Sequence, residues 1–366
     1  MVSTNTYNYF MSLAIKLGMN VLGQVAPNPA VGCVLECNGE VLSSGVTDMI
    51  TGMHAEVVAI NKAIKLGFDL SQVTMFVTLE PCCHYGKTPP CVKKIIDSGI
   101  RKVVIATKDY NVLVNGGGIK ALLNHGVEVH YGVLENEARR MHAGFFATVI
   151  YNKPLVTLKL AMSINGKITA PLGYSNRISN NAAINDAHKL RSTHDAIMVG
   201  GGTLAVDNPE LTCRISGYEH RSPIRVILGG DIRNGLRLLD TVDKVSVWFI
   251  TSKYTECPSG VNSLLIPRGQ DGLIPINKVL NLLCSMGITR LLVEGGLRVA
   301  SSFLFSDSVD ILHIYRSPKI ISGTKSVFDD LFMQSGKIFF QFTLDYSYTI
   351  EDNIVEVYKK KSNEFL

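Results

Sequence analysis

A histidine, a glutamate and three cysteines near the start of the chain have spacings that suit metal chemistry. His54 and Glu56 lie in the stretch MHAEVVAI, and Cys82, Cys83 and Cys91 lie in TLEPCCHYGKTPPC. Cys82 follows a strand-like run, whereas His54 and Cys91 each open a helix-like run. The positive end of a helix favours the thiolate that binds a metal. One imidazole and two thiolates are three zinc ligands, and three ligands leave the fourth tetrahedral position for water, as in catalytic zinc sites.

Glu56 lies two residues after His54, close enough to reach such a water without being a ligand. Zinc deaminases use this arrangement: the metal activates water, the water attacks an amino-bearing ring carbon, and the glutamate moves protons to the leaving ammonia. Taken singly, a His-x-Glu at a helix start is usually a capping carboxylate, and a buried cysteine is usually a small hydrophobe. Their combination favours a zinc site.

The second cysteine ligand is open on spacing alone. Deaminases of this kind generally place it three residues after the first, whereas Cys82 and Cys91 are nine positions apart. Cys83 is therefore a rival ligand.

These residues must be positioned by alternating strands and helices. The first half alternates strand-like with helix-like runs, at residues 30–36, 55–67, 74–80, 91–99, 102–107 and 118–126. A second alternation covers residues 155–163, 194–202, 224–230, 244–250, 276–287, 288–296 and 297–305. Both patterns predict α/β layers, in two domains that divide near residue 150.

Glycine turns mark the second half, in IMVGGGTLAVDNPELTCR and LLVEGGLRVASSFL. Glycines between a strand and a helix let backbone N–H groups approach a phosphate, so we expect a nucleotide here. Neither stretch matches a Rossmann fingerprint or a P-loop. The alternative for either turn alone is ordinary packing between elements.

Composition excludes several classes of protein. The 366 residues are 46% hydrophobic and 18% charged, and the net charge of +5 is spread without Lys/Arg-rich runs. This balance disfavours nucleic acid and suits a small phosphorylated substrate. No stretch approaches the roughly 20 apolar residues of a membrane helix, and the eight cysteines are too few and uneven for a disulfide framework. We expect a cytoplasmic protein that binds neither membrane nor nucleic acid.

The zinc motif, together with PNPAVGCVL (27–35), resembles the deaminase half of the bifunctional riboflavin biosynthesis deaminase–reductases. That resemblance implies a cytidine-deaminase-like α/β/α sandwich, catalytic Glu56, and one Zn²⁺ held by His54, Cys82 and Cys91. It implies that Asn28, His84, Lys87 and Asn111 hold the pyrimidine and its ribose phosphate. Thr47 stands where the family usually has histidine, and DYNVLVNGGG (109–118) lacks the family's prolines.

The second half is similar to the reductase half of the same family, in KLAMSINGKI, DNPELTCR and VEGG. The resemblance implies a dihydrofolate-reductase-like α/β fold that uses NADPH. The implied cofactor contacts are Ala161, Arg177, Thr203, Asp207, Gly296, Leu297, Arg298, Val299, Ala300, Ser301 and Ser302. The implied substrate contacts are Ser175, Arg191, Leu211, Arg214 and Glu294, with both arginines on the phosphate. Asn165, Arg177 and Gly230 depart from the usual family residues.

Together these features predict a deaminase domain over residues 1–147 and a reductase domain over residues 148–366. The expected substrates are phosphorylated pyrimidines, and the resemblance implies a homo-oligomer formed through the reductase domains. Two alternatives remain. A nucleic-acid base deaminase with an unrelated second domain predicts a basic, aromatic groove. A structural zinc scaffold predicts a fourth protein ligand, for which Cys83 is the obvious candidate.

Overall fold

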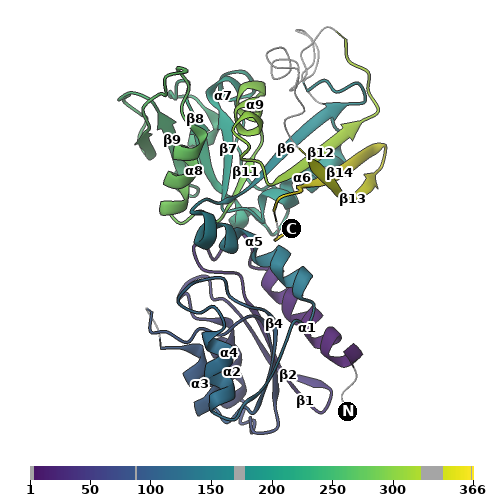
Figure 1. Cartoon of the computed structure of the whole chain (residues 1–366). Helices are drawn as coiled ribbons and strands as arrows, with labels where there is room; N and C mark the ends of the chain where they lie inside the picture. Colours follow the sequence, from purple (N-terminus) through teal and green to yellow (C-terminus); the bar gives the residue numbers. More distant parts are fainter. Residues whose placement is uncertain (1–3, 87–88, 169–177, 323–340, 364) are drawn as a thin grey trace. The chain divides into compact units, whose positions relative to one another are not determined.

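The computed structural model describes residues 4–86, 89–168, 178–322, 341–363 and 365–366. It forms two compact units (Figure 1). The first unit comprises Met1–Asn152 with Phe365–Leu366, and the second comprises Lys153–Glu364. The division thus falls slightly after residue 147, and the first unit includes two residues from the end of the chain.

Among the described residues, the first unit contains a five-stranded sheet in the order β2-β1-β3-β4-β5. Its strands are β1 (Gly32–Cys37), β2 (Glu40–Val46), β3 (Thr74–Leu79), β4 (Lys102–Thr107) and β5 (Glu128–Tyr131). β1 pairs antiparallel with β2 and β3, whereas β3, β4 and β5 run parallel. The segments that follow β3 and β4 therefore leave the same edge of the sheet.

Helices cover both faces of this sheet, as predicted for an α/β/α sandwich (Figure 1). One layer contains α1 (Thr4–Met19) and α5 (Glu135–Tyr151), and the other contains α2 (Ala55–Lys65), α3 (Cys91–Asp97) and α4 (Gly117–Asn124). Phe76 and Val104 of the sheet are fully buried against Met11 of α1 and Ala138 of α5. This apolar layer holds the sheet edge that carries the cysteines in a fixed place.

The second unit contains a nine-stranded sheet, again counting described residues, in the order β10-β9-β8-β7-β11-β6-β12-β14-β13. Its strands are β6 (Leu155–Ser163), β7 (Ala196–Gly200), β8 (Ile224–Leu228), β9 (Val247–Thr251), β10 (Val261–Leu265), β11 (Arg290–Val293), β12 (Ile311–Ser317), β13 (Phe342–Ile350) and β14 (Asn353–Lys360). The sheet is parallel from β10 to β12 and antiparallel where β14 and β13 continue it.

The described helices of this unit are α6 (Asn181–Arg191), α7 (Gly201–Asp207), α8 (Ile276–Ser285) and α9 (Leu297–Phe305), with short 3₁₀ turns at Glu219–Arg221 and Arg237–Thr241. α7 starts directly after β7, and three residues separate Val293, which ends β11, from the start of α9. Because β7 and β11 are parallel neighbours, the two predicted glycine turns lie side by side at one sheet edge.

Candidate active sites

Three metal-binding side chains meet beside the sheet of the first unit. His54 caps the start of α2, Cys91 is the first residue of α3, and Cys82 follows β3. The Nδ1 atom of His54 lies 3.1 Å from Cys91 Sγ and 3.5 Å from Cys82 Sγ. All three ligand atoms lie within 4.8 Å of one another. Zinc bonds of about 2.0–2.3 Å in a tetrahedron separate neighbouring ligand atoms by roughly 3.5–3.8 Å, so this group fits zinc.

Cys83 lies outside this group. Its thiol contacts the carbonyl oxygen of Leu113 at 3.7 Å, in the loop that follows β4. Within the part of the chain that the structure describes, the metal-binding group has three members, not the four of a closed structural site. The geometry therefore favours an open, catalytic site.

The two thiols of the group share a proton unequally. Hydrogen bonds from Cys91 and His54 lower the pKa of Cys82 to about 4, and the backbone N–H of Cys91 donates to Cys82 Sγ at 3.3 Å. The neighbouring Cys82 sulfur and burial raise the pKa of Cys91. The thiol of Cys82 therefore ionises more readily than that of Cys91.

Glu56 is buried beside the metal group, with 4% of its surface exposed. Burial raises the pKa of its carboxyl group, because a low-dielectric site disfavours the charged form. A carboxyl group that accepts a proton more readily than an exposed one suits proton transfer near neutral pH.

A small cavity of about 50 Å³ adjoins these groups. Its lining residues are Asn28, Pro29, Val31, Thr47, His54, Glu56, Leu79, Glu80, Cys82 and Asp109. Among the predicted substrate contacts, Asn28 is part of the lining. His84 lies in the loop before α3, Asn111 lies in the loop after β4, and Lys87 is outside the described residues.

Thr47 has a structural role at this cavity. Its hydroxyl donates to the carbonyl oxygen of Pro29 at 2.7 Å and accepts from the N–H of Val31 at 3.0 Å. The residue that departs from the family pattern therefore fastens the segment that carries Asn28.

Two acids at the cavity, Glu80 and Asp109, are absent from the predicted site residues. The buried carboxylate of Glu80 accepts backbone N–H bonds from Asp109 at 3.2 Å, Gly116 at 3.0 Å and Ile119 at 3.0 Å. Burial raises the pKa of Asp109 to about 6. Both acids come just after parallel neighbouring strands, and this position is the signal that could have found them.

The second unit has a larger cavity, of about 650 Å³, at the edge where the glycine turns lie. The predicted contacts that line it are Ala161, Thr203, Asp207, Glu294, Gly296, Leu297, Arg298, Val299 and Ala300. Ser301 and Ser302 lie further along α9, and Ser302 donates its hydroxyl to Arg298 O at 2.8 Å. Ser175 and Arg177 fall outside the described residues.

Two glycines of this cavity are required by close contacts. A Cβ atom at Gly201 would lie 2.5 Å from Gly230 Cα, and one at Gly296 would lie 2.4 Å from Thr203 Oγ1. Gly296 also has a φ of +74°. Without side chains at these glycines, backbone N–H groups at the N-terminus of α9 can approach the phosphates of a dinucleotide. The residues therefore fit NADPH.

Glu294 carries a charge network at the inner end of this cavity. Arg191 binds its carboxylate in a bidentate pair, Nε to Oε1 at 2.6 Å and Nη2 to Oε2 at 2.8 Å. Burial favours the protonated carboxyl, but the charges of Arg191 and Lys159 outweigh it and lower the pKa of Glu294 to about 2. The guanidinium group of Arg191 therefore binds Glu294 in the bidentate manner that we predicted for the substrate phosphate.

Lys159, which lines the same cavity, is absent from the predicted residues. It is the one charged residue in the apolar run LVTLKLAMS. Burial lowers its pKa. A lysine inside an otherwise apolar strand is unusual, and this feature of the sequence could have identified Lys159 as a candidate site residue.

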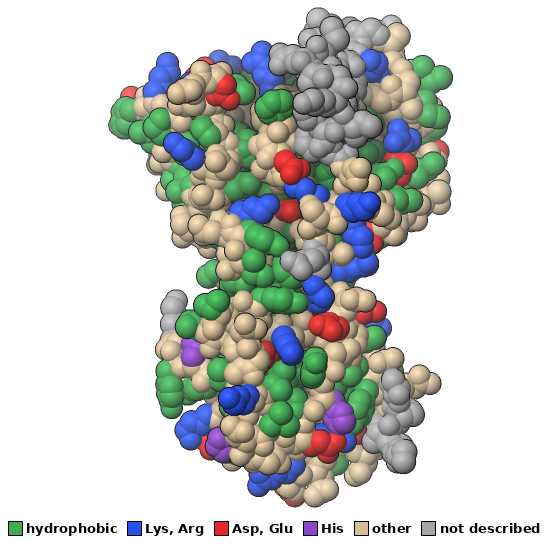
Figure 2. Space-filling view, in the orientation of Figure 1, with side chains coloured by type: hydrophobic (Ala, Val, Ile, Leu, Met, Phe, Trp, Pro, Cys, Tyr) green, Lys and Arg blue, Asp and Glu red, His purple; other side chains and the backbone are tan. Residues whose placement is uncertain are grey.

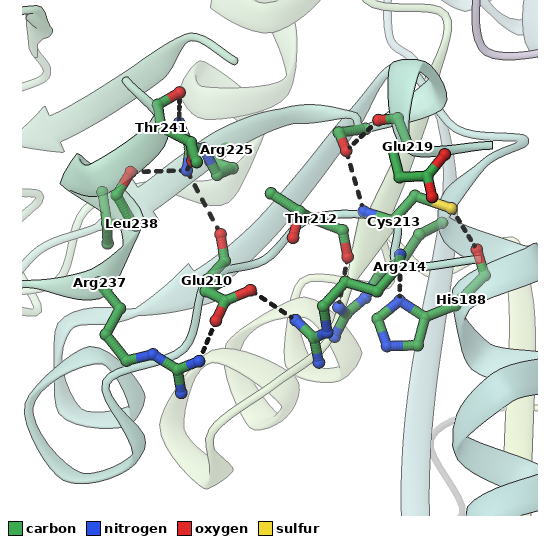
Figure 3. A network of polar contacts seen from close by, with 12 residues as sticks. His188, Glu210, Thr212, Cys213, Arg214, Glu219, Arg225, Arg237, Leu238 and Thr241 are labelled. Atoms are coloured by element: carbon green, nitrogen blue, oxygen red, sulfur yellow. Dashed lines mark hydrogen bonds and ion pairs between the residues drawn. The ribbon is translucent and has the colours of Figure 1, made fainter. Parts of the chain in front are cut away.

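The loop 208–214 carries the other predicted arginine (Figure 3). Glu210 binds the side chains of both Arg214, at 3.3 Å, and Arg237. The fully buried Arg225 donates to the backbone oxygens of Glu210 at 3.4 Å and Leu238 at 2.6 Å. The side chain of Arg214 is 49% exposed, and it remains accessible to a phosphate.

The neighbouring part of this loop is held more tightly. The backbone N–H of Arg214 donates to His188 Nδ1 at 3.2 Å. Leu211 is buried with a φ of 59°. Arg191 donates from Nη1 to the carbonyl oxygen of Thr212 at 2.9 Å, which links the loop to the network of Glu294.

Known proteins resemble the chain over nearly its whole length. The profile of the RibD C-terminal domain matches residues 154–355, and that of the cytidine and deoxycytidylate deaminase zinc-binding region matches residues 4–107. The riboflavin biosynthesis protein RibD of Aquifex aeolicus is 36% identical over 326 residues, which are 87% of this chain and 89% of that protein. The chain belongs to the RibD family.

Other RibD proteins agree with this assignment. RibD of Bacillus amyloliquefaciens is 38% identical over 330 residues, 86% of this chain and 85% of that protein. A diaminohydroxyphosphoribosylaminopyrimidine deaminase/5-amino-6-(5-phosphoribosylamino)uracil reductase from Thermotoga maritima has a TM-score of 0.88 and 35% identity, and the match covers 98% of this chain and 99% of that one.

The family confirms the predicted class of enzyme. Like other RibD proteins, the chain is a bifunctional deaminase and reductase of riboflavin biosynthesis, with zinc in the deaminase and NADPH in the reductase. The cytidine-deaminase-like and reductase folds are confirmed as well. Among the described residues, no helix is long and apolar enough to cross a membrane.

Proposed function

We propose that the first unit removes the 2-amino group of 2,5-diamino-6-ribosylamino-4(3H)-pyrimidinone 5′-phosphate by hydrolysis. The second unit then reduces the ribosyl group of the product to ribityl. The observation that carries the first assignment is the group of His54, Cys82 and Cys91 beside buried Glu56. The Thermotoga maritima relative is named as both a deaminase and a reductase, which supports the assignment of one activity to each unit.

In the first unit, the three side chains hold the metal and Glu56 moves the protons. Zinc, when held there, would supply the activation of a water molecule. Glu56 is placed to accept a proton from the attacking water as the water oxygen bonds to the amino-bearing ring carbon. Glu56 then delivers a proton to the amino nitrogen, the C–N bond breaks, and ammonia leaves. Asn28, His84, Lys87 and Asn111 are proposed to orient the pyrimidine and its phosphate.

In the second unit, the turn before α9 and the residues of α7 hold the cofactor. NADPH supplies the hydride to C1′ of the sugar. Thr203 and the N–H groups from Gly296 to Ala300 are proposed to bind its phosphates. Glu294 and Lys159, which both line the cavity of this unit, are proposed to contact the sugar, and Arg214 to bind the substrate phosphate. Ser175 and Arg177 stay predictions.

Small molecules, not nucleic acid, are the proposed partners. On the face seen in Figure 2, Lys and Arg side chains are interspersed with Asp and Glu on both units. This mixture supports a small substrate over a polyanion, which attracts a continuous basic surface. Absence of membrane binding and a cytoplasmic location remain predictions from the sequence composition, and association through the second unit remains a prediction from the family resemblance.

The test is to incubate purified protein with the diamino pyrimidine phosphate, with and without NADPH, and to identify the products by mass. Without NADPH we expect ammonia and the deaminated ribosyl compound, and with NADPH the ribityl compound. Glu56→Gln should keep zinc but release ammonia about 10²–10⁴-fold more slowly, because general acid–base catalysis contributes that much.

The matched control is NADPH oxidation by the same variant when the deaminated pyrimidine is supplied directly. This rate should equal that of the wild type. Ammonia release by Glu56→Gln at a near-normal rate would refute the role of Glu56, and wild-type protein that leaves both substrates unchanged would refute the proposed function.

A further inference from the structure

Phe365 lies far along the chain from the metal site but is packed in the first unit. Only 2% of its surface is exposed. Its ring centroid lies 5.1 Å from that of Tyr110, at an interplanar angle of 72°, and 5.4 Å from that of Phe146 on α5. Arg139, also on α5, lies over the rings of Phe365 at 5.6 Å and Tyr110 at 5.9 Å.

Tyr110 links this aromatic cluster to the deaminase cavity. Its ring is held on two sides, by Phe365 and by Phe146, whose centroid is 4.8 Å away. Its chain neighbours are Asp109, which lines the cavity, and Asn111. The N–H of Asn111 donates to the carboxylate of Asp109 at 2.8 Å, so the two residues on either side of Tyr110 are joined directly.

This turn has a polar anchor on its other side. Glu80 accepts the N–H groups of Asp109, Gly116 and Ile119, and so holds the backbone of the loop. The ring of Tyr110, packed between Phe146 and Phe365, adds an apolar anchor to this polar one. Phe146 belongs to α5, but Phe365 is the part of the clamp that arrives from a distant segment of the chain.

We propose that Phe365 is a positioning residue of the deaminase. It holds Tyr110, and through Tyr110 it sets the orientation of Asp109 and Asn111 toward the pyrimidine phosphate. The inference rests on the proposed function of the first unit. Because the metal ligands and Glu56 lie on other segments, Phe365 affects substrate binding and leaves the hydrolytic groups unchanged.

The test measures kcat and KM of ammonia release for Phe365→Ala and Phe365→Leu in the full chain. We expect kcat/KM of Phe365→Ala to fall by about 10- to 100-fold, because a displacement of about 1 Å at a binding group can cost that much. The loss should appear mainly in KM, as expected when a binding contact is lost equally from ground and transition states. Phe365→Leu should lie between Ala and wild type.

Three controls separate positioning from general damage. Zinc content and NADPH oxidation with the deaminated pyrimidine should match the wild type. Phe68→Ala, which removes a 40% exposed ring after α2, should leave KM unchanged. In a double-mutant cycle, Tyr110→Leu and Phe365→Ala should be clearly non-additive, because the effect of one acts through the other.

The outcomes are decisive. Wild-type KM in both Phe365 variants would overturn the proposal, as would additive effects with Tyr110→Leu. Should Phe365→Ala be recovered only unfolded, a raised KM with normal kcat in Phe365→Leu supports the proposal and an unchanged KM overturns it. Wild-type protein that releases no ammonia refutes the proposed function instead, and the two failures are thus distinct.

Discussion

Cys82 and Cys83 are adjacent in the chain but face different surroundings. Cys82 lies 3.5 Å from His54 Nδ1, whereas Cys83 contacts the carbonyl oxygen of Leu113. Burial raises the pKa of Cys83, which disfavours the thiolate that a metal requires. The backbone after β3 therefore separates a sulfur that is placed to bind a metal from one that packs against a loop.

Substitution of single cysteines by serine tests which sulfurs bind the metal. Cys83→Ser should bind zinc as the wild type does. Cys91→Ser should lose at least about 100-fold in affinity, since even outer-shell changes cost about 10–100-fold. Competition with a chromophoric chelator measures both, on protein whose fold has been checked. If Cys83→Ser loses zinc and Cys91→Ser keeps it, Cys83 is the ligand and the nine-residue spacing is wrong.

The residues that the sequence identified best are those whose chemistry is rare. His54, Glu56, Cys82 and Cys91 form a combination that is uncommon outside zinc enzymes, and the structure brings them together. Glu80, Asp109 and Lys159 were missed because acids and lysines are common, and what distinguishes them is burial at a cavity. Burial depends on the neighbours that a tertiary fold supplies, and a local pattern does not contain it.

Both cavities lie where parallel strands end, because elements that leave neighbouring strands meet at one edge. In the second unit α7 and α9 start at such an edge, and their glycines allow close approach. A Cβ atom at Gly201 would meet backbone atoms of Gly229 and Gly230, whereas one at Gly202 would meet nothing within 4 Å. Adjacent glycines of one helix thus have different reasons to be glycine.

This contrast predicts opposite effects on stability. Gly201→Ala should destabilise the second unit by about 1–3 kcal/mol, the usual cost of overpacking. Gly202→Ala, the matched control, should be neutral or stabilise by up to about 1 kcal/mol through helix propensity. Urea unfolding followed by the fluorescence of Trp248, the only tryptophan of the chain and a residue of β9, measures the second unit alone. Equal stabilities of the two variants would show that the close contact at Gly201 is unimportant.

Several strands with both faces buried were predicted, but burial alone did not suffice, because β12 is buried along most of its length and was not predicted. β3, β4, β6 and β7 have almost continuous apolar burial, and the predicted runs cover them. The strands β10 and β13 have mixed or largely exposed patterns and were not predicted. At a sheet edge, pairing with the next strand decides the conformation, and side-chain alternation carries little of that information.

For the molecule as a whole, buried histidines predict a loss of stability in acid. Burial lowers the pKa of His194 in the second unit to about 3, whereas an unfolded histidine titrates near about 6.5. Between these values the unfolded chain binds the extra proton, so stability falls as the pH drops below about 6.5. The contribution of His194 at pH 5 is about 2 kcal/mol.

Replacement of His194 isolates its contribution to the pH dependence of the free energy of unfolding. The loss of unfolding free energy between pH 7 and pH 5 should be smaller by about 2 kcal/mol in His194→Gln than in the wild type. Trp248 fluorescence in urea at each pH gives both values for the second unit. His188 and His313, whose pKa values are also lowered, are present in both proteins and cancel. Parallel pH profiles of the two proteins would contradict the assignment.

The burial of Phe365 in the first unit also bears on how the protein is made. Domains generally fold in order as the chain leaves the ribosome, and the strands and helices that the structure describes in the first unit all lie within residues 4–152. The packing of Phe365 against Tyr110, however, cannot form until Phe365 has been translated, and Phe365 follows the entire second unit in the chain. A nascent first unit can thus fold and take up zinc early, while its substrate loop receives the support of Phe365 only after the second unit has been translated. Full deaminase activity would then arise almost together with the reductase that consumes its product.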